Sequence, residues 1–228
     1  MITLNNINKS YQLGRHIIRV LKDINLQVEK GEFAAIVGPS GSGKSTLMNL
    51  IGCIDKPDSG SVIVDQMIID YSSLTGLSAF RAGKLGFIFQ SFNLIPVLSA
   101  YENIEFPLLL TDLNKSERQT RINTIAEKVG LTTILAHKPA EMSGGQKQRV
   151  AIARALINNP SVVLADEPTA NLDEETSHTI MSLMKNLNND INSTFLITTH
   201  DPLVRNYTER EILLKDGRVL INELEAVS

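Results

Sequence analysis

A glycine-rich stretch early in the chain carries the residue types needed to bind a phosphate chain. Residues 38–46 read G-P-S-G-S-G-K-S-T and match the pattern G-x-x-x-x-G-K-[ST] in full. Glycines allow the backbone N–H groups of such a loop to turn toward phosphate oxygens. Lys44 is expected to reach the β- and γ-phosphates of a nucleotide, and the Ser45 hydroxyl to ligate Mg²⁺. The predicted site comprises Gly38, Ser40, Gly41, Ser42, Gly43, Lys44, Ser45 and Thr46.

Two adjacent carboxylates further along the chain could complete this site. Asp166 and Glu167 end the apolar run V-V-L-A-D-E at residues 162–167. In open α/β sheets, ligands bind at the carboxyl ends of the strands. Asp166 is therefore expected to hold Mg²⁺, and Glu167 is placed to orient and deprotonate an attacking water. The alternative, a solvated acidic loop, is disfavoured beside a complete phosphate loop.

A second helix start with phosphate-binding chemistry lies far along the chain. Residues 141–149 read E-M-S-G-G-Q-K-Q-R. Ser143 stands at an N-cap position, and Gly144 and Gly145 leave the helix start unobstructed. The alternative is an ordinary N-cap, and the two roles are compatible. One chain thus carries two such helix starts.

The elements that must position these residues follow from hydrophobic periodicity and turn signals. Strands are predicted over 24–28, 32–37, 61–64, 85–90, 161–165 and 194–198, with a hairpin over 211–220 that turns at residues 216–217. Helices are predicted over 44–51, 115–129, 143–158 and 174–188, and capping boxes at 99–102, 114–117 and 143–146. The segment 91–158 shows no convincing strand. This alternation predicts a mostly parallel sheet with a smaller helical lobe.

Composition limits the possible partners. The 228 residues are 43% hydrophobic, and 22 Lys and Arg stand against 25 Asp and Glu, a net charge of -3. Without a basic excess, no nucleic-acid partner is expected. The single cysteine, Cys53, cannot form an intrachain disulfide and is expected to be buried. The apolar runs fall short of the ~20 residues of a membrane span, so any membrane association is expected to come from a partner.

The order of these motifs resembles the ATP-binding cassette (ABC) ATPase family. The phosphate loop, Gln90, S-G-G-Q at 143–146, Asp166-Glu167 and His200 occur in the family's order, and the resemblance covers essentially the whole chain. It implies ATP and Mg²⁺ as cofactors and ATP hydrolysis as the activity. The implied fold is α/β, with a P-loop NTPase (RecA-like) core, an antiparallel β part and an inserted α-helical subdomain. We predict one domain over 1–228, with a catalytic lobe at 1–90 and 159–228 and a helical lobe at 91–158.

The resemblance implies roles for four further residues, each with an alternative. Gln90 resembles the glutamine that senses Mg²⁺ and the γ-phosphate, although it could be a polar strand end. His200, in T-T-H-D, resembles the switch histidine that contacts the γ-phosphate, where a structural histidine is the alternative. Asp173 resembles the aspartate at the dimer seam or caps a helix. Tyr11 resembles the aromatic residue that stacks on adenine, or is an exposed tyrosine.

The resemblance also explains the two phosphate-binding helix starts. In that family, the S-G-G-Q motif binds the γ-phosphate of the ATP on a second subunit. Two chains related by a two-fold axis repeat each contact, so both nucleotides can be enclosed. We therefore expect an ATP-bound homodimer in which Ser143, Gly144, Gly145 and Gln146 reach the partner's nucleotide. Met142 replaces the family's usual Leu and conserves its volume, so little effect is expected.

A membrane partner is implied by the apolar residues that follow Gln90. By resemblance they form a groove for a short helix of a permease subunit, although they could instead pack the helical lobe's own core. These residues are Phe92, Leu94, Ile95, Pro96, Val97, Leu98 and Tyr101.

The runs L-M-N-L-I-G-C-I-D-K-P-D-S-G and A-D-E-P-T-A-N-L-D are similar to the macrolide-exporter and lipoprotein-release branch of the family. The implied function is the ATP-binding and hydrolysing subunit of a bacterial ABC transporter complex. It would couple ATP-driven dimer closure to a membrane permease, for export or for lipoprotein or antimicrobial handling, at the cytoplasmic face of the cell membrane. The alternative is a non-transport ABC-type ATP switch, but family members of that kind carry long coiled coils or two cassettes per chain. A GTPase is disfavoured because N-K-S-Y at 8–11 lacks the aspartate of the guanine motif.

Overall fold

The computed structural model describes residues 1–220, and its larger sheet is mostly parallel. The strands of this sheet are β3 (Phe33–Val37), β6 (Leu85–Ile88), β7 (Val162–Asp166), β8 (Thr194–Thr199), β9 (Arg210–Lys215) and β10 (Arg218–Leu220). They lie in the order β10-β9-β3-β8-β7-β6, and only β10 runs antiparallel to its neighbour. Asp216 and Gly217 both have positive φ at the β9–β10 turn, as the predicted hairpin requires.

A second, antiparallel sheet holds the N-terminal residues. Its strands are β1 (Ile2–Leu13), β2 (His16–Val28), β4 (Ser59–Val64) and β5 (Met67–Ile68), in the order β2-β1-β4-β5. The prediction covered only the last part of β2 and missed β1. Register shifts between Leu4 and Ser10 interrupt the pairing of β1 with β2, so the strand lacks the regular alternation that sequence reading depends on.

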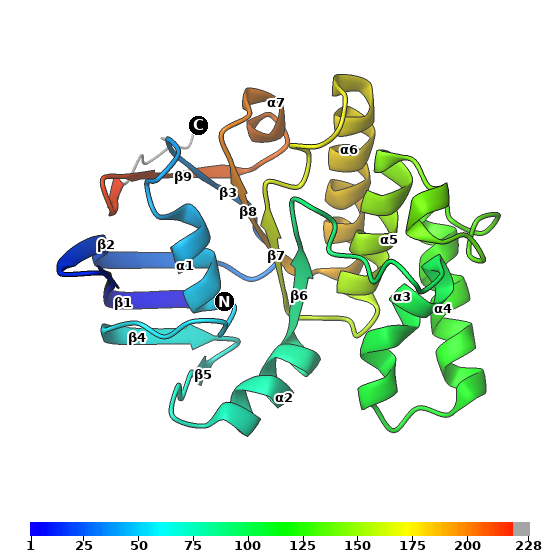
Figure 1. Ribbon diagram of the computed structural model, residues 1–228, viewed down its shortest axis with the longest axis horizontal. Helices are drawn as coiled ribbons and strands as arrows, with labels where there is room; N and C mark the ends of the chain where they lie inside the picture. The colour runs from blue at the N-terminus through cyan, green and yellow to red at the C-terminus, as the bar shows by residue number, and fades with distance from the viewer. Residues whose placement is uncertain (221–228) are drawn as a thin grey trace.

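Helices cover both faces of the larger sheet. They are α1 (Lys44–Ile51), α2 (Leu74–Lys84), α3 (Ala100–Glu105), α4 (Lys115–Val129), α5 (Gly144–Leu156), α6 (Glu174–Ile191) and α7 (Pro202–Arg205), with 3-10 turns η1 (Phe106–Leu110) and η2 (Pro139–Glu141). Figure 1 shows the antiparallel sheet on the left, the larger sheet in the middle, and α3, α4 and α5 on the right. The α/β fold with an antiparallel part and inserted helices is confirmed. Among residues 1–220, no helix combines the length and apolar content needed to cross a bilayer.

Local signals account for most of the helix boundaries. Ser99, Asn114 and Ser143 each form a complete capping box, as predicted. Helix α2 was missed because Gly76 and Gly83 weaken its helical signal. The strand predicted over 85–90 was too long: β6 ends at Ile88, because the chain turns where Phe92 N donates to Phe89 O at 3.0 Å.

Two apolar cores lie on opposite faces of the larger sheet. Alternate residues of β3 separate them, since Phe33 joins one core and Ala34 the other. The first core unites the helices α3 to α6 with one sheet face, and Met142 belongs to it. The second joins α1, the antiparallel sheet and the other face, and it contains the buried Cys53. The division into lobes at 90/91 and 158/159 stays a prediction, because the cores divide by sheet face.

Asn103 on α3 fixes the loop that follows Gln90. Its buried side chain accepts from Ile95 N at 2.8 Å, and it donates to the carbonyls of Ile95, Leu98 and Ser99 at 3.2, 3.1 and 2.9 Å. We expect Asn103→Ala to lower the free energy of unfolding by about 2–4 kcal/mol, because it leaves buried backbone groups unpaired.

Urea denaturation measures this change. The matched control is Asn123→Ala on the exposed side of α4, which should not destabilise because alanine favours helices. If the two variants were equally stable, Asn103 would not hold the loop.

Candidate functional site

The predicted phosphate loop joins the carboxyl end of β3 to the start of α1 and borders a cleft of about 840 Å³. The cleft gathers residues from six separate places in the sequence. Its lining includes Tyr11, Val20, Ser40, Gly41, Gly43, Lys44, Ser45, Thr46, Gln90, Glu167 and His200. The structure therefore brings most of the sequence-predicted site residues to one place.

The loop itself has the geometry of a phosphate cradle. Gly41 and Gly43 have φ of 78° and 105°, and a Cβ on Gly38 would lie 2.1 Å from the Leu214 carbonyl oxygen. Lys44 Nζ donates to Gly38 O at 2.8 Å, so its ammonium group lies across the loop. The Ser42 Oγ is buried and has no hydrogen-bond partner among the described residues. Backbone donors, a cation and an unpaired hydroxyl at a helix start suit a polyphosphate.

Two side-chain oxygens that could ligate a metal ion lie close together beside the phosphate loop. Ser45 Oγ lies 3.4 Å from Asp166 Oδ1, and the Thr198 hydroxyl donates to the same oxygen. A hydroxyl and a carboxylate are hard ligands of the kind that Mg²⁺ prefers, together with phosphate oxygens. Within residues 1–220, no group of three or more His, Cys, Asp or Glu side chains could hold a metal alone. The donor set therefore fits a Mg²⁺ ion that shares its coordination with a phosphate.

Glu167 is held in an unusual backbone conformation at the end of β7. Its φ is 46°, in the left-handed region, and its N–H donates to Thr198 O at 3.1 Å. His200 Nδ1 lies 2.8 Å from Glu167 Oε1. The Glu167 side chain is largely buried while that of His200 is exposed in the cleft. A carboxylate fixed in this way can accept a proton from a water in the cleft.

Gln90 reaches the cleft from the turn after β6. Its carbonyl accepts from Asn171 Nδ2 at 2.8 Å. Arg154 of α5 donates to the carbonyls of Phe92 and Asn93 at 2.8 and 2.6 Å, which fixes the next residues. Gln90 was predicted to end a strand, but it lies in the turn after β6. Asn171 and Arg154 hold this turn from its two sides.

The second helix start does not line this cleft. Ser143 Oγ accepts from Gln146 N at 3.2 Å, so Ser143 caps α5. A Cβ on Gly145 would lie 2.7 Å from Thr176 Cγ2, which shows how closely α5 packs on α6. Asp173 caps α6 by accepting from Thr176 N, and this hydrogen bond lowers the pKa of Asp173. Neither Asp173 nor Ser143, Gly144, Gly145 and Gln146 lines the cleft.

Three residues around the site were not found from sequence. Thr198 contacts Asp166 and the Glu167 backbone, and the T-T-H-D run was its only signal. The hydroxyl of Tyr11 donates to Asp55 Oδ2 at 2.7 Å, and Lys9 Nζ binds Asp55 Oδ1 at 2.8 Å. Lys9 and Asp55 lie 46 positions apart, so no local pattern connects them.

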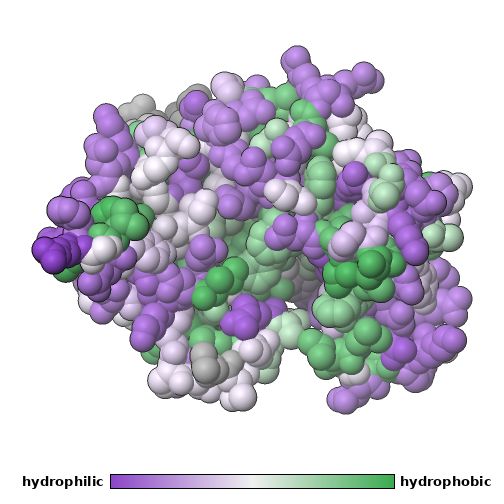
Figure 2. Space-filling model, in the orientation of Figure 1, coloured by the Kyte–Doolittle hydropathy of each residue, from purple (hydrophilic) through white to green (hydrophobic). Residues whose placement is uncertain are grey.

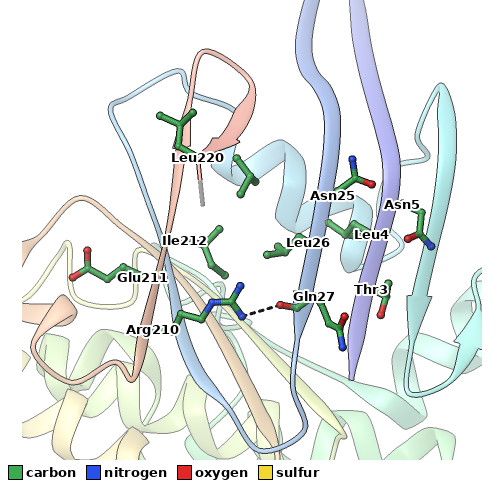
Figure 3. A pocket seen from close by; sticks show the side chains of 11 residues that line it. Thr3, Leu4, Asn5, Asn25, Leu26, Gln27, Arg210, Glu211, Ile212 and Leu220 are labelled. Atoms are coloured by element: carbon green, nitrogen blue, oxygen red, sulfur yellow. Dashed lines mark hydrogen bonds between the residues drawn. The ribbon is translucent and has the colours of Figure 1, made fainter. Parts of the chain in front are cut away.

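A further cavity of about 330 Å³ lies between the two sheets, beside β2 and β9 (Figure 3). Its charged residues are already paired. Arg210 Nη1 donates to Gln27 O at 2.9 Å, and Glu211 accepts two hydrogen bonds from Arg205. It therefore offers no free cation for a phosphate, unlike the cleft beside the phosphate loop, where Lys44 lies.

Comparisons with known proteins agree with this geometry. Residues 21–170 match the ABC transporter family. The chain is 47% identical over 228 residues to the ABC transporter ATP-binding protein YvrO of Bacillus subtilis, covering 100% of this chain and 99% of that protein. It is 45% identical to the macrolide export ATP-binding/permease protein MacB 1 of Yersinia pestis, covering 96% of this chain and 34% of that longer protein.

A solved structure shows the same fold. The ATP-binding cassette MJ0796 of Methanocaldococcus jannaschii, a dimer in a post-hydrolysis state with ADP and Pi, has a TM-score of 0.89 and 46% identity, with 97% of each chain covered. The chain belongs to the ABC transporter family, and within it to the ATP-binding subunits that hydrolyse ATP.

Thr198 should affect hydrolysis through both carboxylate residues. Thr198→Val keeps the side-chain shape but removes the hydroxyl that contacts Asp166 and the Glu167 N–H. We expect kcat for ATP to fall about tenfold with the fold retained, in proportion to a lost hydrogen bond to a charged group. Steady-state phosphate release measures kcat.

The matched control is Thr194→Val at the opposite end of β8, where the hydroxyl accepts from Gly31 N at 3.0 Å. That variant should lose stability without losing kcat. If Thr198→Val and the unchanged protein had equal kcat, the Thr198 contacts with Asp166 and Glu167 would not matter for hydrolysis.

Proposed function

We propose that this chain works as an ATP-driven homodimer that moves a membrane permease formed by a separate chain. The observation that carries the proposal is the separation of the two phosphate-binding helix starts. Loop 38–46 borders the cleft, whereas residues 143–146 start a helix outside it. One chain therefore supplies half of the contacts that would enclose a triphosphate.

Within the cleft, each residue has a proposed role in hydrolysis. The loop residues Gly38, Ser40, Gly41, Ser42, Gly43 and Thr46 bind the phosphates through the backbone, and Lys44 contacts the β- and γ-phosphates. Ser45 and Asp166 hold Mg²⁺, with Gln90 beside them, and the bound ion neutralises charge on the phosphate oxygens. Glu167 accepts the proton of the attacking water, and His200 orients Glu167 and the γ-phosphate. Tyr11 stacks on the base.

The second helix start acts on the partner's nucleotide. Ser143, Gly144, Gly145 and Gln146 would bind its γ-phosphate, and Asp173 would lie at the seam between the chains. A second cleft of about 860 Å³ supports this placement, because it runs from Gln90, Glu167 and His200 to Leu172 and Glu174. A two-fold axis would repeat this arrangement and create two equivalent sites. The dimeric state of the MJ0796 cassette supports the same arrangement.

The proposed permease contact is the apolar surface of the helical segment. Val97, Phe106, Leu109 and Leu110 are 70%, 50%, 55% and 79% exposed, while Leu94 and Tyr101 pack against the core. Figure 2 shows apolar side chains on both sides of a hollow between the α2 region and the α3 region. A short permease helix would bury this surface. The chain would then lie at the cytoplasmic face of the cell membrane.

The similarity to MacB supports the exporter and lipoprotein-release branch. In that relative, the name assigns an ATP-binding and a permease part to one protein, and the present chain covers 34% of its length. We propose that this chain works with a permease, and that the complex serves export or lipoprotein or antimicrobial handling. With a net charge of -3 the chain has no basic excess, so we propose no nucleic-acid partner.

Glu167→Gln tests the proposed general base. The amide cannot accept the proton, so we expect kcat to fall by about 100-fold or more while ATP binding is kept. Without turnover, ATP should hold the two chains together as a stable dimer. Phosphate release and size-exclusion chromatography with ATP measure the two effects.

The matched control is Glu127→Gln on the exposed side of α4, which should leave both measurements unchanged. If Glu167→Gln hydrolysed ATP at the normal rate, Glu167 would have another role.

Ser143→Arg tests the contribution of the second chain. The long cation at the start of α5 should block the partner's γ-phosphate, so hydrolysis is lost while the monomer still binds ATP. Turnover per chain of the unchanged protein should also fall on dilution. Equilibrium binding of ATP and phosphate release measure the two properties.

Ser116→Arg at the exposed start of α4 is the control and should keep full activity. A turnover that stays constant down to a strictly monomeric population would refute the shared site.

A further inference from the structure

The Tyr11 ring at the edge of the cleft is held by a small charged network. Its hydroxyl donates to Asp55 Oδ2 at 2.7 Å, while Tyr11 as a whole is 40% exposed and lines the cleft beside Val20. Lys9 Nζ lies 4.8 Å from the ring centroid. A cation at that distance is attracted to the ring. The Tyr11 hydroxyl also hydrogen-bonds the Thr46 side chain of the phosphate loop, so three side chains hold Tyr11 while much of it stays open to the cleft.

Asp55 is the centre of this network. Its Oδ1 accepts from Lys9 Nζ at 2.8 Å and from Lys56 N at 2.7 Å, and its Oδ2 accepts from Tyr11. Burial acts to raise the pKa of Asp55, but the hydrogen bonds from Lys9 and Tyr11 outweigh it and hold that pKa below its ordinary value. The carboxylate is thus ionised and fully engaged at neutral pH.

Lys9 is buried, which is unusual for a lysine. Only 6% of it is exposed, and its ammonium donates to Asp55 and to Lys56 O, both at 2.8 Å. Burying a charge is costly unless it is paired, so Lys9 and Asp55 stabilise each other's position. The pair connects β1 to the segment after α1, the helix that the phosphate loop begins. The pair therefore fixes β1, the strand that carries Tyr11, to the segment that follows α1.

We propose that Asp55, fixed by Lys9, is a positioning residue that holds Tyr11 as a preformed wall for the planar base of the nucleotide. The inference rests on the proposed binding of ATP in this cleft. A ring fixed before binding loses less conformational freedom when a base packs on it. Asp55 can act on the base only through Tyr11, because Asp55 does not line the cleft and contacts none of its phosphate-binding residues.

Tyr11→Phe is the main test, because it removes the hydroxyl and leaves the ring and the buried Lys9–Asp55 pair in place. We expect the KM for ATP to rise about three- to tenfold, as for a lost hydrogen bond to a carboxylate, with kcat unchanged. The inhibition constant of inorganic tripolyphosphate, which has no base, should change much less than the KM, because Thr46 loses only a side-chain contact with Tyr11 and keeps its backbone contact with phosphate. Tyr207→Phe, which removes a hydroxyl that pairs with His178 at 2.8 Å, is the matched control and should change neither constant.

A double-mutant cycle separates positioning from a general structural effect. If Asp55 acts through the Tyr11 hydroxyl, the KM of the double variant Asp55→Ala with Tyr11→Phe equals that of Asp55→Ala alone. If the two substitutions instead raised the KM by factors that multiply in the double variant, the proposal would be overturned. A KM for Tyr11→Phe equal to that of the unchanged protein would overturn it as well. If Tyr11→Phe weakened tripolyphosphate inhibition as much as it raised the KM for ATP, that result would overturn the proposal too. Tyr11→Phe carries the test even where Asp55→Ala is unstable.

Tyr11→Ala distinguishes this inference from the proposed function. A raised KM for Tyr11→Ala with a normal KM for Tyr11→Phe would refute the role of Asp55 and keep Tyr11 at the base. An unchanged KM for Tyr11→Ala would instead remove Tyr11 from the nucleotide site and refute both.

Discussion

The negative charge of a polyphosphate is the constraint that organises this molecule. Holding it takes many N–H donors and cations at one point, and parallel strands supply that point because their carboxyl ends meet at one edge. The register pairs Val37 of β3 with Thr199 of β8, and Asp166 of β7 with Thr198 of β8. The phosphate loop, the two carboxylates and His200 follow directly from these strand ends.

The same chain links this site to the second phosphate-binding helix start, the start of α5, which does not line the cleft. Gln148 of α5 is fully buried and donates to the carbonyl of Pro168 at 2.6 Å, one residue beyond Glu167. Glu167 already holds a left-handed φ of 46°, which the Thr198 contact maintains. A displacement of α5 would therefore act on the position of the Glu167 carboxylate. In the proposed dimer, each chain would thus couple the partner's γ-phosphate to its own hydrolytic residue.

Features fixed by short-range patterns could be predicted from sequence, and those fixed by distant contacts could not. The phosphate loop, the Asp166–Glu167 pair and the capping box at Ser143 each depend on a few neighbouring residues, so their patterns were complete. Strand β1 was missed because its irregular pairing hides the alternation, and Gln90 was placed on a strand that ends earlier. The Lys9–Asp55 contact and the boundary between the cores depend on how separate elements pack.

The packing also decides how force from a permease would reach the nucleotide. The helices α3 to α6 share one core with one face of the larger sheet, so they pack as one body with it. The exposed apolar residues lie around α3 and η1, and Asn103 ties α3 to the loop that leads back to Gln90. Arg154 fixes the middle of that loop to α5. A load on the proposed permease surface would therefore reach Gln90, which lies in the turn after β6 and lines the cleft.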